Sequence, residues 1–187
     1  MKKIFYILLI ILFKINIAYS LIEVDITRGN LDPLPIAVSP LHVDSKSDNY
    51  QDNKTKELGE LISSVVEKNF RSTGLFNPLN KDAFVQKPDI AHLKPRFEDW
   101  SLITAQALVT GKLLIKDEKL KIEFRLWDVA ANKEMIALAF TTTPSNWRRV
   151  AHIISDKIYE RLTGETGYFD TRIIYVSETG PRTQRVK

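Results

Sequence analysis

The sequence predicts an α/β domain in which two long helices and one short helix accompany a mixed β-sheet. Three observations support this fold class. Residues 34–79 read as a strand, a helix and a second strand. Residues 107–140 alternate between apolar and polar positions, as consecutive antiparallel strands do. Residues 56–73 and 144–162 each carry apolar side chains at helical spacing, so both predict helices with one buried face.

The β-α-β unit comes first. Ile36–Val38 is a short, continuous apolar run between prolines, typical of an inner parallel strand. The polar stretch 44–54 is expected to be a loop before a helix at Lys56–Thr73, which Gly74 would end in a left-handed conformation. Phe76–Leu79 contains a proline and predicts a short edge strand. A right-handed crossover should place the helix on one face of the sheet.

The second unit begins after a predicted loop at residues 80–95. Phe97, Trp100 and Ile103 share one face of an expected short helix. Three strands should follow, joined by turns at Asp117-Glu118 and at residues 130–133. Their apolar positions are Ala107, Val109, Gly111, Leu113, Ile115, Leu120, Ile122, Phe124, Leu126, Ile136, Leu138 and Phe140.

The last predicted helix starts with Thr143 as its N-cap and Pro144 at its first position. Trp147 lies on its apolar stripe, so we interpret Trp147 as a core residue and the two following arginines as solvated. Gly164 is placed to end this helix. Tyr168 and Phe169 then serve as aromatic anchors, and Ile173–Val176 reads as a strand that belongs to a second unit, although an ordinary C-terminal helix with a frayed strand is the alternative.

The positive net charge does not indicate a nucleic-acid partner. Lys2, Lys3 and Lys14 lie in the first twenty residues; without them 24 basic residues stand against 23 acidic ones. The chain contains no cysteine, which excludes disulfides, Cys-ligated zinc and a thiol nucleophile.

The N-terminus has the pattern of a secretory signal peptide over residues 1–20. Two lysines precede the apolar run Ile4–Phe13, and small residues near Ser20 predict cleavage between Ser20 and Leu21. Lys14 interrupts the apolar stretch, so it is short of the ~20 residues of a transmembrane helix. Export of the protein is therefore expected, and an uncleaved N-terminal anchor is the alternative.

No catalytic, cofactor-binding or metal-binding residue is predicted, and no small-molecule substrate is expected. The three histidines, His42, His92 and His152, lack metal-ligand spacing, and His152 with Asp156 reads as a polar surface pair. No glycine-rich phosphate loop is present. An enzyme or ligand-binding domain would need a polar cluster in a pocket, for instance His92 with Arg96 and Asp99.

The segment Leu21–Thr27 is the predicted interaction element. Ile22, Val24 and Ile26 alternate with Glu23, Asp25 and Thr27, and Arg28-Gly29-Asn30 then breaks the strand. Such a strand is suited to pairing with the sheet edge of another protein, and equally to being the first strand of its own sheet.

Several motifs are spread over nearly all of the chain after residue 20, and the last of them is the most specific. They are Thr27–Gly29, Pro35–Val38, Gly74–Leu79, Trp100, Ala107–Gly111, Asp156–Gly164 and Gly167–Ser177. Together these motifs resemble the TolB family, the soluble periplasmic component of the Tol–Pal envelope system.

The resemblance implies a non-enzymatic, protein-binding role in the periplasm. It implies a mixed five-stranded sheet in an N-terminal α/β domain, here residues 21–167, followed by a six-bladed β-propeller. The family links the inner-membrane protein TolA to the lipoprotein Pal, supports outer-membrane integrity and envelope constriction at cell division, and in some members serves bacteriocin import. The residues that the resemblance assigns to TolA binding are Leu21, Ile22, Glu23, Val24, Asp25 and Ile26.

The resemblance departs from the family pattern after residue 167. A propeller blade needs ~40 residues, so residues 168–187 are expected to be a linker and the truncated first strand of a propeller. Because the resemblance places Pal binding on the propeller, it assigns Pal binding to no residue of this chain. Two alternatives remain: a stand-alone ligand-binding or enzymatic α/β domain, and a non-functional fragment.

Overall fold

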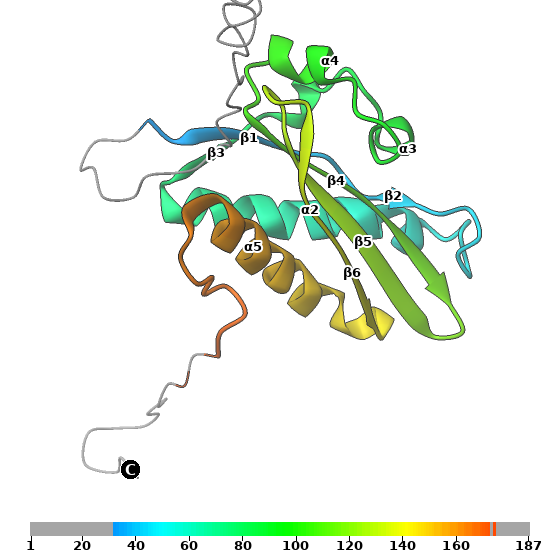
Figure 1. The fold of residues 1–187 in the computed structure, drawn as a ribbon. Helices are drawn as coiled ribbons and strands as arrows, with labels where there is room; N and C mark the ends of the chain where they lie inside the picture. Colours follow the sequence, from blue (N-terminus) through cyan, green and yellow to red (C-terminus); the bar gives the residue numbers. More distant parts are fainter. Residues whose placement is uncertain (1–31, 173, 175–187) are drawn as a thin grey trace, which may run out of the picture.

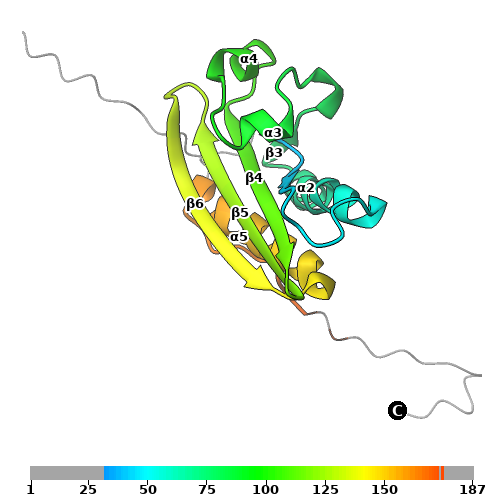
Figure 2. The same ribbon diagram turned by 90° about the vertical axis from the view of Figure 1, so that its right-hand side faces the viewer.

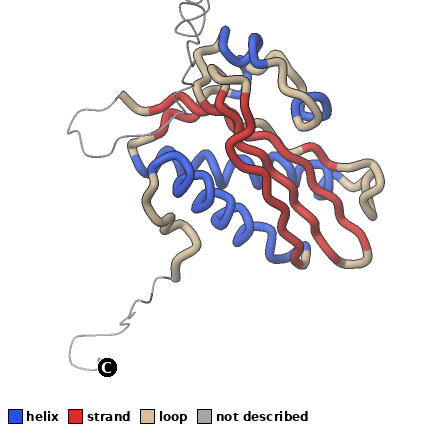
Figure 3. The backbone as a smooth tube through the Cα atoms, in the orientation of Figure 1, coloured by secondary structure: helices blue, strands red, loops and turns tan. Residues whose placement is uncertain are grey.

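The structure, a computed structural model, describes residues 32–172 and residue 174. Figure 1 shows the order of the elements and Figure 3 separates helices from strands. The elements are β1 (Leu34–Val38), β2 (His42–Val43), α2 (Asn53–Thr73), β3 (Phe76–Pro78), η1 (Lys81–Ala83), α3 (Pro88–Ala91), α4 (Phe97–Leu102), β4 (Ala107–Lys116), β5 (Lys119–Asp128), β6 (Lys133–Thr142), η2 (Pro144–Asn146) and α5 (Trp147–Thr163).

A mixed sheet in the order β3-β1-β4-β5-β6 confirms the predicted fold class. β1 is parallel to both of its neighbours, β3 and β4, while β5 and β6 are antiparallel. A sixth, two-residue strand, β2, was not predicted; it pairs with β4 beyond the end of β1. Since β2 has only His42 and Val43, it shows no alternation that sequence reasoning can detect.

The turns and helix ends lie where the sequence predicts them. Asp117 and Glu118 have φ values of 50° and 59°, as the tight turn between two twisted antiparallel strands requires. Gly74 and Gly164 end α2 and α5 with φ values of 70° and 76°. The starts of the two helices differ from the prediction. α2 begins at Asn53, within the stretch expected as loop and before the predicted Lys56. The residues after Thr143 first form the 3₁₀ turn η2, so that α5 begins at Trp147.

Both long helices cover the same face of the sheet, behind the strands in Figure 2. Phe70 and Ile62 of α2 and Ile154 and Ile158 of α5 are fully or nearly fully buried in this core. Gly59 lets α2 approach the sheet, because a Cβ atom there would lie 2.0 Å from the carbonyl oxygen of Leu41. We call this face the helix-covered face.

The opposite face carries a smaller cluster under α3, α4 and the loop that joins them. Its buried members are Ala37, Ala91, Trp100, Ala105, Leu108 and Val129. The short helix α4 confirms the predicted one, whereas the stretch expected as plain loop, residues 80–95, contains η1 and α3. We call this face the loop-covered face.

Candidate functional surface

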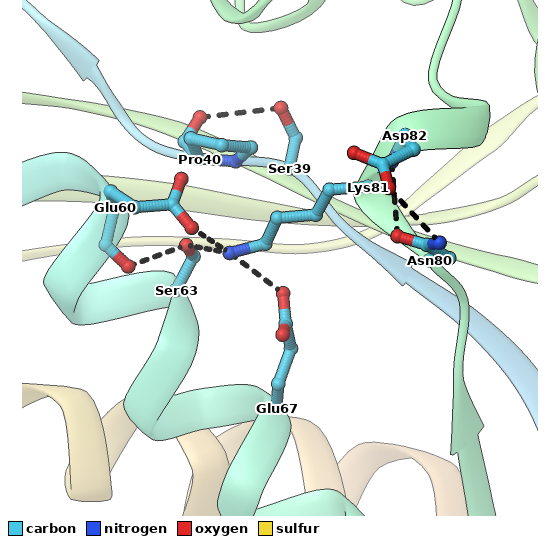
Figure 4. A network of polar contacts seen from close by, with 8 residues as sticks. All are labelled: Ser39, Pro40, Glu60, Ser63, Glu67, Asn80, Lys81 and Asp82. Atoms are coloured by element: carbon cyan, nitrogen blue, oxygen red, sulfur yellow. Dashed lines mark hydrogen bonds and ion pairs between the residues drawn. The ribbon is translucent and has the colours of Figure 1, made fainter.

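The polar network drawn in Figure 4 fastens η1 to α2. The ammonium group of Lys81 bonds to the Glu60 carboxylate, lies 3.0 Å from Oε1 of Glu67 and donates to Oγ of Ser63 at 3.0 Å. Asn80 caps η1 by accepting from the backbone N–H of Asp82. Because Lys81 joins two carboxylates one turn or more apart on α2, it holds the start of the loop against the helix.

One ammonium group faces two carboxylates in this network. Burial raises the pKa of Glu67, and the ammonium group of Lys81 opposes that rise. A hollow of about 370 Å³ lies beside the network, lined among others by Glu67, Arg71 and Lys81. The arrangement is a polar tie between the loop and the helix.

Two histidines that are fifty residues apart stack face to face. The rings of His42 and His92 lie 4.5 Å apart at an interplanar angle of 5°. The Nδ1 atom of His92 is 2.9 Å from the carbonyl oxygen of Pro88, a contact in which the ring N–H donates. Burial lowers the pKa of His42, and the neighbouring His92 lowers it further. The stack fastens α3 to β2, next to a hollow of about 490 Å³ that His42 helps to line.

The structure does not gather His92, Arg96 and Asp99 around one pocket. Arg96 and Asp99 form an ion pair with Nη2 of Arg96 2.6 Å from Oδ2 of Asp99, but His92 is engaged with His42 instead. The hollows of about 370, 380 and 490 Å³ are lined by other residues than these three. Within residues 32–172 and 174, no group of three or more His, Asp or Glu side chains could hold a metal ion.

Comparison with known proteins places the chain in a family. A family model described as the TolB amino-terminal domain matches residues 22–135. The chain is 67% identical over 189 residues to the Tol-Pal system protein TolB of Pelagibacter ubique (strain HTCC1062). It belongs to the TolB amino-terminal domain family. That alignment covers 100% of this chain and 42% of the relative, so the chain spans less than half the length of that TolB protein.

The fold agrees with that of a solved TolB. The crystal structure of TolB from Acinetobacter baumannii superposes with a TM-score of 0.59 at 21% sequence identity, covering 80% of this chain and 33% of that one. The likeness shows that the β-α-β unit, the three-stranded meander and the two helices are the TolB N-terminal arrangement.

The residues that the resemblance assigns to TolA binding lie outside the described part of the chain. Leu21–Ile26, with the expected cleavage between Ser20 and Leu21, precede Asp32, where the description begins. The strand expected at Ile173–Val176 is represented only by Ile174, which is 94% exposed and not in a strand. Of the helices that are described, none has both the length and the apolar character needed to cross a bilayer.

Two features were missed by sequence reasoning, the His42–His92 stack and the Lys81 network. Each joins residues from segments far apart in the chain, and neither has a spacing signal in one segment. His152, expected beside Asp156, instead has its Nδ1 atom 3.0 Å from Nδ2 of Asn69 on α2.

Proposed function

We propose that this chain is a non-enzymatic adaptor of the Tol–Pal system, acting in the periplasm in support of outer-membrane integrity and envelope constriction at cell division. The observation that carries the proposal is the 67% identity to a Tol-Pal system protein TolB along the whole chain.

The adaptor binds a TolA-like inner-membrane protein through Leu21–Ile26. In this mechanism the strand adds to a sheet edge of the partner, where backbone hydrogen bonds supply affinity and Ile22, Val24 and Ile26 fill alternate pockets.

A Pal-like lipoprotein is the second partner of the longer relatives under this proposal. The Pal-binding surface belongs to the propeller of those relatives. The chain described here therefore supplies the part of the adaptor that binds TolA. No nucleic acid, cofactor or small-molecule substrate takes part.

Binding to the periplasmic domain of TolA, measured by isothermal titration calorimetry, tests this mechanism. Deleting residues 21–26 should abolish binding. Replacing Val24 with Asp should weaken it by about tenfold or more, because a buried valine contributes ~1.5 kcal/mol or more. Glu23→Gln, on the opposite side of the strand, is the matched control and should stay within about twofold.

Under this proposal the strand is free to pair with the partner, so all three variants should unfold at the temperature of the unchanged chain. Unchanged TolA binding after the deletion would eliminate Leu21–Ile26 as the binding element. Equal losses in Val24→Asp and Glu23→Gln would contradict pocket filling by one side of the strand.

A further inference from the structure

The chain folds back on α5 immediately after that helix ends. In Figure 1 the orange segment after α5 turns and runs alongside the helix instead of continuing away from it. The carboxylate of Asp156, nearly two turns before the end of α5, accepts hydrogen bonds from two consecutive backbone N–H groups. These are the N–H of Phe169 at 2.7 Å and that of Asp170 at 3.1 Å. Hydrogen bonds to an ionised acceptor are stronger than those between neutral groups. Because both donors here are backbone N–H groups, the contact fixes the course of the main chain.

The fit between the returning segment and α5 leaves no room for an extra atom. A Cβ atom on Gly167 would lie 2.4 Å from the Cα atom of Asp156 and 2.5 Å from its Cβ and Oδ1 atoms. Glycine at this position therefore lets the returning backbone reach the Asp156 carboxylate.

Aromatic rings and an ion pair hold the same segment at two further points. The ring of Phe169 lies 5.9 Å from that of Tyr159 and 6.4 Å from that of Phe70, both in edge-on geometry. Phe169 thus joins the core of the helix-covered face, as expected of an aromatic anchor. Nε of Arg149, on α5, is 3.2 Å from both carboxylate oxygens of Asp170.

We propose that residues 165–170 form a rigid exit arm, docked along α5, and that Asp156 is the positioning residue that sets the direction in which the chain leaves the domain. Three contacts hold these six residues. The Asp156 carboxylate accepts from two backbone N–H groups, Gly167 packs closely against Asp156, and the partly buried Phe169 packs against the main core. The chain then leaves Asp170 at a defined angle to α5, and a force applied at Thr171 passes into the core.

This inference does not depend on which partner the segment Leu21–Ile26 binds. It predicts a defined orientation of the segment after Asp170, a property that a flexible linker would lack.

The absence of cysteine makes site-specific spin labelling direct. A nitroxide pair is placed at Thr171→Cys and at Lys68→Cys, an exposed position on α2, and the distance distribution is measured by double electron–electron resonance. With Asp156 present we expect one narrow distribution. Asp156→Ala should broaden it at least twofold in width, and Gly167→Ala should do the same by forcing the segment off α5 while the carboxylate stays.

Glu160→Ala is the matched control, because Glu160 is an acid of the same helix whose side chain forms an exposed ion pair with Lys157. It should leave the distribution narrow. Circular dichroism shows whether each variant keeps its helices, and Asp156→Asn, which keeps one acceptor oxygen, should broaden the distribution less than Asp156→Ala. A distribution that is already broad in the unchanged chain, or one equally broad in Asp156→Ala and Glu160→Ala, would overturn the proposal.

Discussion

The two faces of the sheet are stabilised in different ways. Among the described residues, the helix-covered face buries 24 hydrophobic residues in one cluster, whereas the loop-covered face buries six, of which three are alanines. Burying a large apolar side chain is worth ~2 kcal/mol, so apolar contact is the main source of stability on the first face. The second face is too small for that, and polar side chains hold its loop in place.

Gln86 is the centre of the polar ties on the loop-covered face. Its Oε1 atom accepts from the indole N–H of Trp100 at 3.0 Å and from the backbone N–H of Arg96 at 2.9 Å. Its Nε2 atom donates to the carbonyl oxygen of Lys94 at 3.0 Å. The side chain is 3% exposed, so these groups have little access to water that could replace it. The comparison teaches that one face depends on hydrophobic volume and the other on satisfied hydrogen bonds.

The largest expected effect comes from a charge on the helix-covered face. Ile154→Asp places a carboxylate in the core at a position that is 2% exposed. It should cost more than about 4 kcal/mol, through the lost apolar burial and the unpaired charge, and so unfold the domain. Thermal unfolding followed by circular dichroism measures the effect.

Arg148→Asp introduces the same residue at an exposed position on the same helix and should leave the melting temperature nearly unchanged. If Ile154→Asp melted like Arg148→Asp, the assignment of α5 to the main core would be wrong.

A smaller and more local effect is expected on the loop-covered face. Gln86→Ala leaves an indole N–H, a backbone N–H and a carbonyl oxygen without their partner, at a cost of about 2–3 kcal/mol. Amide hydrogen exchange should accelerate in α3 and α4 and stay unchanged in α2, because the main core is intact. Gln51→Ala, at an exposed glutamine, is the control. Acceleration that extended to α2 would show that the two faces unfold together.

The same contrast separates what the sequence could predict from what it could not. Residues of the helix-covered face recur with helical or alternating spacing, so α2, α5 and the strands β4 to β6 were predicted close to their observed bounds. The loop-covered face depends on contacts between Gln86 and residues eight to fourteen positions away, in a stretch without periodicity. Residues 80–95 therefore read as loop, and α3 and η1 were not predicted.

The candidate site was also predictable only in part. Alternation of apolar and polar residues predicts a strand at Leu21–Thr27, but alternation cannot tell which sheet edge that strand joins. Of the two predicted aromatic anchors, Phe169 is partly buried against the main core, whereas Tyr168 is 49% exposed. The role of Asp156 was not predicted, since a carboxylate that binds backbone thirteen and fourteen residues later looks in sequence like any exposed helical acid.

The smallest expected effect is a pH dependence confined to the loop-covered face. His42, stacked on His92, has its pKa lowered below 6.5 by burial and by that neighbour; Lys112 acts in the same direction and Asp89 and Asp44 oppose it. As pH falls below 6.5, the unfolded chain binds the proton before the folded one does. The contribution of the stack is therefore complete above pH 6.5 and is lost as pH falls toward the lower folded pKa.

Hydrogen exchange in α3, corrected for its intrinsic pH dependence, should show more frequent opening at about pH 5.5 than at about pH 7.5, with a smaller change than Gln86→Ala causes. His42→Phe keeps an aromatic ring against His92 but cannot titrate, so it should remove most of the difference between the two pH values. His152→Phe, on α5 of the other face, should preserve the difference. If His42→Phe kept the full pH dependence, the acid sensitivity of this face would have to come from other groups, and the stack would be a packing contact alone.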